Sequence, residues 1–327
     1  MKRTLVYCLA CLSLLLMLGC ERPDSPAKPV DDTQETSTSQ SSISEEESKY
    51  ASETYVDKGV SSGIVSVKEF GAAGDGKADD TEAIQKAVSS GETIYFPAGN
   101  YVLSQPIVIT GKHFWSLYAQ DAWFVYDGDD YAFKINEAEN CHIEIGEILA
   151  PNGGGIEFYS EDAQHWNQYV SLTFGYISCA TDCIYVRVEG DGWCNENQVH
   201  GGRFAGGVNG VRIQKLGGDN PNGWKFYDCG IEGVNNGFHL DAGDGSISNV
   251  SVVNARYGES FDTILRTKGD VHDCLWVGTY AVTPDMVLCS ENTTRFEVIA
   301  PIGWTGHRGC IVDGELMAER TEYERAE

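Results

Sequence analysis

The sequence predicts an all-β fold, a single-stranded right-handed parallel β-helix with a short N-terminal capping helix. Three observations predict it. Apolar strands recur every 21 to 29 residues from 141 to 312, a period typical of solenoids. Two such series run through this region, offset by a near-constant half-period. A single helical pattern stands before them, as expected for a plug over the open edge of the first coil.

The predicted cap begins with a glycine-rich turn. Gly74 and Gly76 flank Asp75 and allow a backbone with positive φ. Asp79 to Thr81 are residue types that cap helix N-termini. Apolar residues then follow at helical spacing and give the helix one apolar face; they are Ala83, Ile84, Ala87 and Val88. The segment is therefore expected to cap the solenoid, and its aspartates are not candidates for catalysis.

The same region, near residues 66–110, also carries a family resemblance. Its two halves read VSVKEFGAAGDGKADDTEAIQKAV and TIYFPAGNYVLSQPIVI. They closely resemble the entry segment of the pectate-lyase-like superfamily, which includes rhamnogalacturonase-type hydrolases, polysaccharide lyases, uronan epimerases and phage tailspike proteins. The resemblance implies a right-handed parallel β-helix that handles polysaccharide. It does not specify a reaction, because function resides in sites grafted onto a fold.

The N-terminal residues predict where the protein is located. Residues 1–19 have two basic residues and then a short apolar run, the pattern of a secretory signal peptide. Leu18, Gly19 and Cys20 resemble a bacterial lipobox, which implies a lipid on Cys20. Residues 20–63 are acidic and rich in Ser, Thr and Glu, so they are expected to form a disordered tether. The predicted location is the bacterial cell envelope, lipid-anchored and extracytoplasmic; the alternative is a freely secreted protein.

Residues 64–315 are predicted to form one β-helix domain, followed by an acidic tail at 316–327. The net negative charge of the domain restricts the classes of partner that it can bind. The chain has a formal net charge of −26, and residues 59–312 keep 33 acidic against 15 basic side chains. Such a surface repels nucleic acid and anionic lipid. An anionic glycan would need a local basic patch or a bridging Ca²⁺, whereas a neutral glycan would need neither.

The two series of apolar strands define the coils. The first series begins at Ile143, Val170, Val199, Trp224, Val250, Leu275 and Phe296. The second begins at Ile156, Ile184, Val211, Phe238, Ile264, Val287 and Ile311, with the register at Ile264 uncertain by one residue. Each coil is expected to lay one strand on each of two sheets.

Turn residues stand immediately before the second series; they are Gly154, Asp182, Asn209, Asn236 and Asp262. Asn and Gly tolerate the left-handed conformation, and stacked amides can hydrogen-bond from coil to coil. The column therefore predicts a structural ladder, which accounts for Asp182 without a catalytic role.

Outward positions on the second series carry the candidate chemistry. Strand residues alternate between the two faces of a sheet. One outward column is then Glu157, Tyr185, Arg212 and His239, and its neighbour is Tyr159, Arg187, Gln214 and Asp241. The first series offers a rival column of Glu144, Ser171, His200, Lys225, Ser251, Trp276 and Glu297, in which functional residue types are less concentrated.

Three functions remain open for this cluster. A lyase acting on uronate would use Arg212, His239 and Asp241 as catalytic groups, with Glu157, Tyr185, Arg187 and Gln214 binding substrate. A hydrolase would need a carboxylate pair, and Glu157 and Asp241 are three coils apart, too far for an inverting pair. The third option is a non-catalytic glycan-binding module or a tailspike-like structural module, monomeric or homotrimeric. No metal site is visible, and Ca²⁺ enters only with a uronan substrate.

Cysteines leave the redox state open. Cys8 and Cys11 lie in the signal and Cys20 is the expected anchor, so eight of the 11 remain in the domain. An even number in an exported chain permits disulfides. Cys183 and Cys310 share a repeat position several coils apart, so they are not expected to pair.

Overall fold

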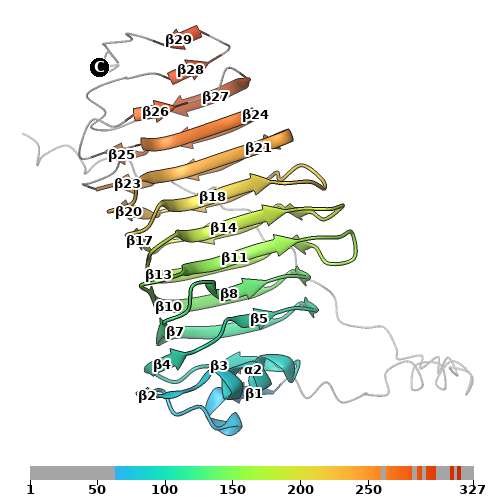
Figure 1. Ribbon diagram of the computed structural model, residues 1–327, viewed down its shortest axis with the longest axis vertical. Coiled ribbons are helices and arrows are strands. Elements are labelled where there is room, and N and C mark those ends of the chain that lie inside the picture. The colour runs from blue at the N-terminus through green and yellow to red at the C-terminus, as the bar shows by residue number, and fades with distance from the viewer. Residues whose placement is uncertain are drawn as a thin grey trace, which may run out of the picture. The chain divides into compact units, whose positions relative to one another are not determined.

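The computed structural model describes residues 63–258, 263–281, 286–288, 292–299, 310–312 and 315–317. Within these residues the chain forms a parallel β-solenoid preceded by one short α-helix (Figure 1). The predictions for residues 1–62 and for the tail at 318–327 lie outside the described residues, as does Asp262.

The strands stack in three rows rather than the two expected. The row that carries the candidate residues, here called the site sheet, consists of β5 (Ile107–Ile109), β8 (Tyr131–Ile135), β11 (Gly154–Ser160), β14 (Asp182–Val188), β18 (Asn209–Lys215), the start of β21 (Asn236–Ser248), the start of β24 (Thr263–Val277) and β26 (Met286–Leu288).

A second row consists of β1 (Ile64–Ser66), β3 (Thr93–Tyr95), β7 (Ser116–Tyr126), β10 (His142–Ala150), β13 (Ser171–Cys179), β16 (Gln198–His200), β19 (Lys225–Tyr227), β22 (Ser251–Val253), the end of β24 and β27 (Thr293–Ile299).

The third row contains the second halves of β7, β10 and β13. Its other strands are β2 (Asp75–Asp79), β4 (Gly99–Leu103), β17 (Arg203–Ala205), β20 (Gly230–Glu232), β23 (Arg256–Tyr257) and β25 (Tyr280–Ala281). This row was missed because β7, β10 and β13 each read as one strand in sequence. In later coils the chain breaks into two short strands, such as β16 and β17, around Gly201 and Gly202, both with positive φ.

Two small sheets of short strands accompany the three rows. One small parallel sheet joins β6 (Lys112–His113), β9 (Ala138–Glu139), β12 (Asn167–Gln168) and β15 (Cys194–Asn195). A separate antiparallel pair joins β28 (Cys310–Val312) and β29 (Glu315–Met317).

The cap forms as the sequence predicted. The 3-10 helix η1 (Val67–Phe70) starts at Ser66, whose side chain accepts a hydrogen bond from the Lys68 amide. The helix α2 (Thr81–Ser89) buries Ile84, Ala87 and Val88. Asp80 is its N-cap residue, but the Asp80 carboxylate accepts from the amides of Ala73 and Gly74 instead of capping the helix. It therefore fixes the glycine turn against the helix.

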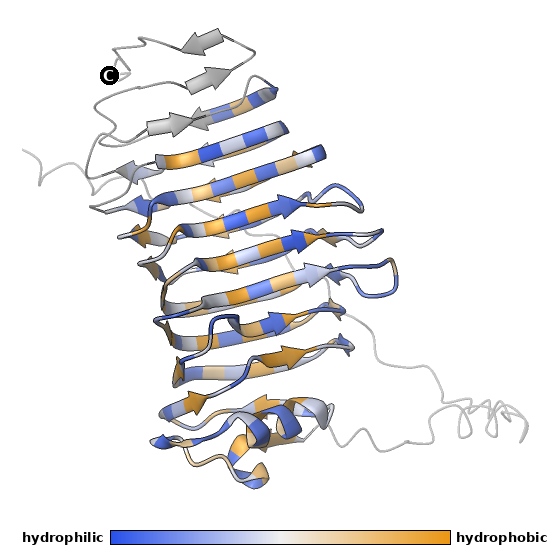
Figure 2. Ribbon diagram, viewed as in Figure 1, coloured by the Kyte–Doolittle hydropathy of each residue, from blue (hydrophilic) through white to orange (hydrophobic). Residues whose placement is uncertain are grey.

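The core lies between the rows. Apolar and polar residues alternate along the strands (Figure 2), which is the period-2 pattern of sheets with one face buried. Inward aromatic rings contact one another both within and between coils; the successive contacts are Phe158–Trp224, Trp224–Phe226, Phe226–Phe238 and Phe238–Trp276. Burying each such side chain stabilises the fold by roughly 1.5–3 kcal/mol.

The predicted turn ladder is present at the start of the site sheet. Asn209 donates to Asp182 at 2.5 Å, Asn236 donates to Asn209 at 2.8 Å, and the Thr263 hydroxyl donates to Asn236 at 2.5 Å. Thr263, rather than Asp262, holds the fourth position. The ladder satisfies buried amides that would otherwise cost free energy.

Two register predictions were wrong. Leu265, not Ile264, aligns with Phe238, because Ile264 occupies the place held by Gly237 in the preceding coil. In the rival column, Trp276 is fully buried and points inward, whereas Leu275 pairs with Ser251. Glu144 and His200 lie two residues beyond the position that Ser171, Lys225, Ser251 and Glu297 share. The rival column therefore mixes three positions along the strands and is not one continuous face.

Candidate functional site

The strand registers place the predicted candidate residues in two adjacent columns on the outward face of the site sheet. The first column is Lys134, Glu157, Tyr185, Arg212, His239 and Arg266. The second contains Tyr159, Arg187, Gln214, Asp241 and Lys268. Loops that follow β11, β14 and β18 project beyond the edge of this sheet (Figure 1).

The N-terminal part of these columns is internally paired. Glu157 is only 3% exposed. Its carboxylate lies 2.8 Å from Nε of Arg187 and 3.2 Å from Nζ of Lys134. Arg187 also pairs with Glu161 and Glu189 from the adjoining loops. Glu157 and Arg187 therefore have charge partners within the protein, which favours a supporting role over direct ligand contact.

Aromatic side chains link the paired region to Arg212. The Tyr131 and Tyr185 rings stack with their centroids 5.6 Å apart, and the Arg212 guanidinium lies 5.0 Å from the Tyr185 centroid. The Tyr185 hydroxyl donates to Oε1 of Gln214 at 2.6 Å. Burial raises the pKa of Tyr185. Tyr185 is thus a neutral platform beneath Arg212 and is poorly suited to act as a base.

Three consecutive rungs then carry nitrogen groups, namely Arg212, His239 and Arg266; we call them the cation row. Adjacent coils lie about 4.8 Å apart. Arg212 makes one long ion pair, 3.8 Å to Asp182 of the ladder, and its Nε is buried without a hydrogen-bond partner. Within the described residues, the exposed Arg266 has no ion pair with a carboxylate.

His239 sits at the centre of the cation row. The imidazole is half-buried between the two arginines. Burial lowers the pKa of His239, and the charge of Arg212 lowers it further. The ring is therefore neutral at neutral pH and can accept a proton.

The Asp241 carboxylate is buried and already has several partners within the protein, unlike a free catalytic acid. It is 6% exposed. One carboxylate oxygen lies 3.2 Å from Nζ of Lys268 and 3.4 Å from Nε2 of Gln214, and the other accepts from the Gly243 amide at 3.2 Å. These contacts position Asp241 in the column next to that of His239.

Lys134 and Arg266 were missed in the sequence. Lys134 lies before Cys141, where the repeat is hard to align. Arg266 was not recognised because the predicted register at Ile264 was wrong by one residue. The signal that locates Arg266 is the ladder, because placing Thr263 opposite Asn236 sets the register of the whole strand.

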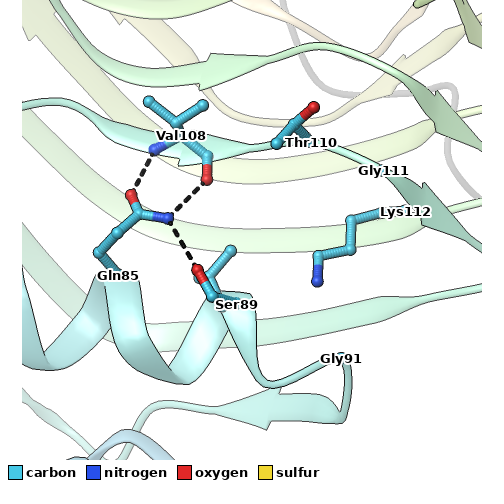
Figure 3. Close-up of a pocket in the computed structure, with 8 residues that line it drawn as sticks. Gln85, Ser89, Gly91, Val108, Thr110, Gly111 and Lys112 are labelled. Atoms are coloured by element: carbon cyan, nitrogen blue, oxygen red, sulfur yellow. Dashed lines mark hydrogen bonds between the residues drawn. The ribbon is translucent and has the colours of Figure 1, made fainter.

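A separate concavity lies under the cap (Figure 3). It has a volume of about 450 Å³ and is lined by Gln85, Val88, Ser89, Gly91, Val108, Thr110, Gly111 and Lys112. The Gln85 amide docks the helix by accepting from the Val108 amide at 2.8 Å and donating to its carbonyl at 2.9 Å. This space is remote in sequence from the cation row and contains none of the predicted site residues.

The described residues hold no group of three or more His, Cys, Asp and Glu side chains arranged to bind a metal ion. No helix among them combines the length and apolarity needed to cross a membrane.

Residues 64–114 match the family model described as rhamnogalacturonase A/epimerase, pectate lyase-like. The matched segment covers the cap and first coils and ends before the candidate columns. Similar curated proteins include the pre-neck appendage protein of Bacillus phage B103, 53% identical over 45 residues, which are 14% of this chain and 5% of that protein. Alginate lyase 7 of Azotobacter vinelandii is 54% identical over 43 residues, 12% of this chain and 5% of that protein.

A probable glucan endo-1,3-beta-glucosidase of Arthroderma benhamiae is 46% identical over 56 residues, 13% of this chain and 6% of that protein. The chain thus spans about a twentieth of the length of these relatives. Among solved structures, ORF18 of Geobacillus virus E2 aligns with 73% of this chain and 59% of its own, with a TM-score of 0.47 and 19% identity. The Streptococcus pneumoniae surface adhesin PfbA aligns with 74% and 79%, with a TM-score of 0.43 and 11% identity.

Proposed function

We propose that this protein binds an extracellular, uronate-containing polysaccharide along the site sheet, with the cation row as the contact for its carboxylates. The observation that carries the proposal is the run of Arg212, His239 and Arg266 on three consecutive rungs. In a domain that is otherwise strongly acidic, this row supplies the local basic patch that an anionic glycan requires.

The pairing pattern supports binding. Glu157, Arg187 and Asp241 already have charge partners, so they stiffen the sheet around the row. Arg212 has only a long ion pair and an aromatic platform, which leaves guanidinium donors for a ligand carboxylate. The protruding loops after β11, β14 and β18 would border a bound chain at one edge (Figure 1).

A lyase is the second candidate, and His239 is the observation that favours it. β-Elimination from a uronosyl residue needs a base for the C5 proton and a cation to neutralise the carboxylate. A neutral imidazole between two arginines supplies both, and a lowered pKa keeps it unprotonated at neutral pH. In this reaction His239 takes the C5 proton, a C4–C5 double bond forms as the C4–O bond breaks, and the leaving oxygen takes up a proton from water.

The experiment is a screen of the full chain, purified in detergent, against polyuronates and neutral polysaccharides, with and without Ca²⁺. Binding is measured together with new reducing ends and absorbance of unsaturated uronate. We expect binding of polyuronates that persists in a chelator, because the arginines provide the positive charge. Retention of neutral glycans alone would contradict the proposal. Unsaturated products that disappear in His239→Gln would establish the lyase, whereas binding without products would leave a glycan-binding module.

Arg256→Ala is the matched control. Arg256 is also an exposed arginine on a strand, but it pairs with Glu232 on the third row. Its loss should not change glycan binding, whereas loss of Arg212 or Arg266 should weaken it.

We also propose that the protein is held in the bacterial cell envelope by a lipid on Cys20. The support is the sequence pattern of residues 1–20. Expression of the wild type in a bacterium should place it in the detergent-soluble membrane fraction, and Cys20→Ser should release it. Equal membrane retention of both proteins would contradict the anchor.

A further inference from the structure

Two buried cysteines flank the turn that begins the ladder. Cys179 ends β13 and Cys183 is the second residue of β14. Their sulfur atoms lie 3.4 Å apart. The other cysteines whose side chains the structure describes have backbone oxygens or an amide beside their sulfurs, and none has a second sulfur; they are Cys141, Cys194, Cys229 and Cys274.

The next coil encloses this pair. Cys179 is 7% exposed and Cys183 is fully buried. A Cβ at Gly207 would stand 3.1 Å from the Cys179 sulfur, so this glycine leaves the room that the sulfur occupies. The Cys183 sulfur lies 3.7 Å from the carbonyl oxygens of Ile177 and Gly206. The two sulfurs are therefore held facing each other inside the solenoid.

We propose that Cys179 and Cys183 form a disulfide when the chain folds in an oxidising compartment. The proposal rests on the exported location inferred from residues 1–20 and is independent of glycan binding. A disulfide needs its sulfurs about 2.05 Å apart. Because the short turn between β13 and β14 brings the two sulfurs into contact, bond formation gains from proximity and does not depend on the next coil.

The bond forms by exchange with a small-molecule or protein disulfide. One cysteine thiolate attacks the donor disulfide and releases the first donor thiol. The second cysteine thiolate then displaces the second donor thiol. The two cysteines lose two protons and two electrons in total, and the donor becomes two thiols. Burial raises the pKa of Cys183, so the exchange belongs to folding, before the next coil covers the pair.

The disulfide would staple the residues that hold Arg212. Asp182 lies inside the five-residue loop closed by the bond. It accepts from the Tyr131 hydroxyl at 2.8 Å and from Asn209 at 2.5 Å, and it lies 3.8 Å from Arg212. The modification would thus fix the first rung of the ladder and the carboxylate behind the cation row.

The test is to unfold the reduced full chain and refold it with a mixture of reduced and oxidised glutathione. The refolded protein is then denatured without reductant, and its remaining thiols are alkylated and mapped by peptide mass spectrometry. We expect Cys179 and Cys183 to be joined and protected, with Cys141, Cys194, Cys229 and Cys274 alkylated. Full alkylation of both Cys179 and Cys183 in refolded wild type overturns the proposal. This test uses only the wild-type chain, so it does not depend on whether a variant folds.

Thermal unfolding gives a second readout. Reductant should lower the midpoint of the refolded wild type and leave Cys179→Ser/Cys183→Ser unchanged. Cys229→Ser is the matched control, a buried cysteine without a sulfur neighbour, and it should keep the reductant-dependent shift. An equal shift in the double variant would assign the effect to another bond and contradict the proposal.

Discussion

His239 is a half-buried imidazole flanked by two guanidinium groups on neighbouring strands. Its neighbours explain both its protonation state and its value to a ligand. Arg212 rests on the Tyr185 ring, while the negative charges of Asp241 and Asp182 partly oppose the effect of the arginine on the His239 pKa. The side chains of the cation row therefore set the local charge. This can be tested at His239 through its pKa and at Arg212 through ligand affinity.

The pKa of His239 should make stability depend on pH. The folded pKa lies below the ordinary value of 6.5, so the unfolded chain binds more protons in the interval between the two values. Stability contributed by the neutral ring is present above pH 6.5 and falls as the pH drops through this interval. His239→Gln should lose less stability than wild type between about pH 8 and pH 5. NMR titration showing a His239 pKa above 6.5 would contradict this.

Arg212 should increase the affinity for polyuronate by donating charge-assisted hydrogen bonds to the carboxylates of the ligand. Loss of such a contact costs about 1.5–3 kcal/mol, so Arg212→Ala should weaken binding roughly tenfold or more. Isothermal titration with a uronate oligosaccharide measures this. Arg256→Ala reports any general effect of removing a surface charge, and equal weakening by both substitutions would remove Arg212 from the site.

At the scale of elements, the ladder determines how each site-sheet strand begins. Asp182, Asn209, Asn236 and Thr263 are all buried, and three hydrogen bonds join them from coil to coil. The ladder fixes the register, and the register decides which side chains face outward. The opposite corner relies on backbone conformation instead, with Phe114, Asn140, Tyr169 and Glu196 all at positive φ.

Asn209→Ala should destabilise the fold strongly. It removes the donor to Oδ1 of Asp182 and the acceptor for Nδ2 of Asn236, so these two buried atoms lose their ladder hydrogen bonds. The expected loss is about 2–4 kcal/mol in the free energy of unfolding, measured by chemical denaturation. Asn152→Ala is the control, since the exposed Asn152 amide hydrogen-bonds only at the surface, to Asp127. Comparable losses in the two variants would show that the ladder adds little.

Phe114→Asn should stabilise the protein. Phe114 has φ 53° and is 82% exposed, so it carries left-handed strain with little packing in return. Asn140, in the following coil, adopts φ 52° with a side chain that tolerates this region. A gain of about 1 kcal/mol is expected in thermal or chemical unfolding. Phe114→Ala keeps the strain and serves as the control that separates backbone relief from loss of the ring.

At the scale of the whole molecule, a strongly acidic chain presents one cationic row on a stack of parallel strands. Long-range repulsion from the acidic surface and short-range attraction to the row act together on an anionic polymer. Salt screens the two differently, because the contact pairs are partly shielded from solvent.

Polyuronate binding should therefore have a maximum in ionic strength. Raising salt from a very low level first screens the repulsion of the acidic domain, and a further rise weakens the contacts to the cation row. The Debye length falls from roughly 30 Å at 0.01 M to about 10 Å at 0.1 M, which spans the range to test. Affinity that rises monotonically with salt would indicate apolar contacts instead of the charge row.

The sequence by itself determined the cap, the solenoid period, the ladder and the two outward columns from Glu157 to Asp241. These depend on local alternation and on polar residues such as Asn209 and Asn236, which begin strands and hydrogen-bond to the adjacent coil rather than adopting the left-handed conformation. Only the tertiary structure decided which charges remain available. It paired Glu157 with Arg187, engaged Asp241 with Lys268, and extended the row to Arg266. Such contacts join strands that lie one coil apart, so they depend on register, and a one-residue error at Ile264 was enough to conceal Arg266.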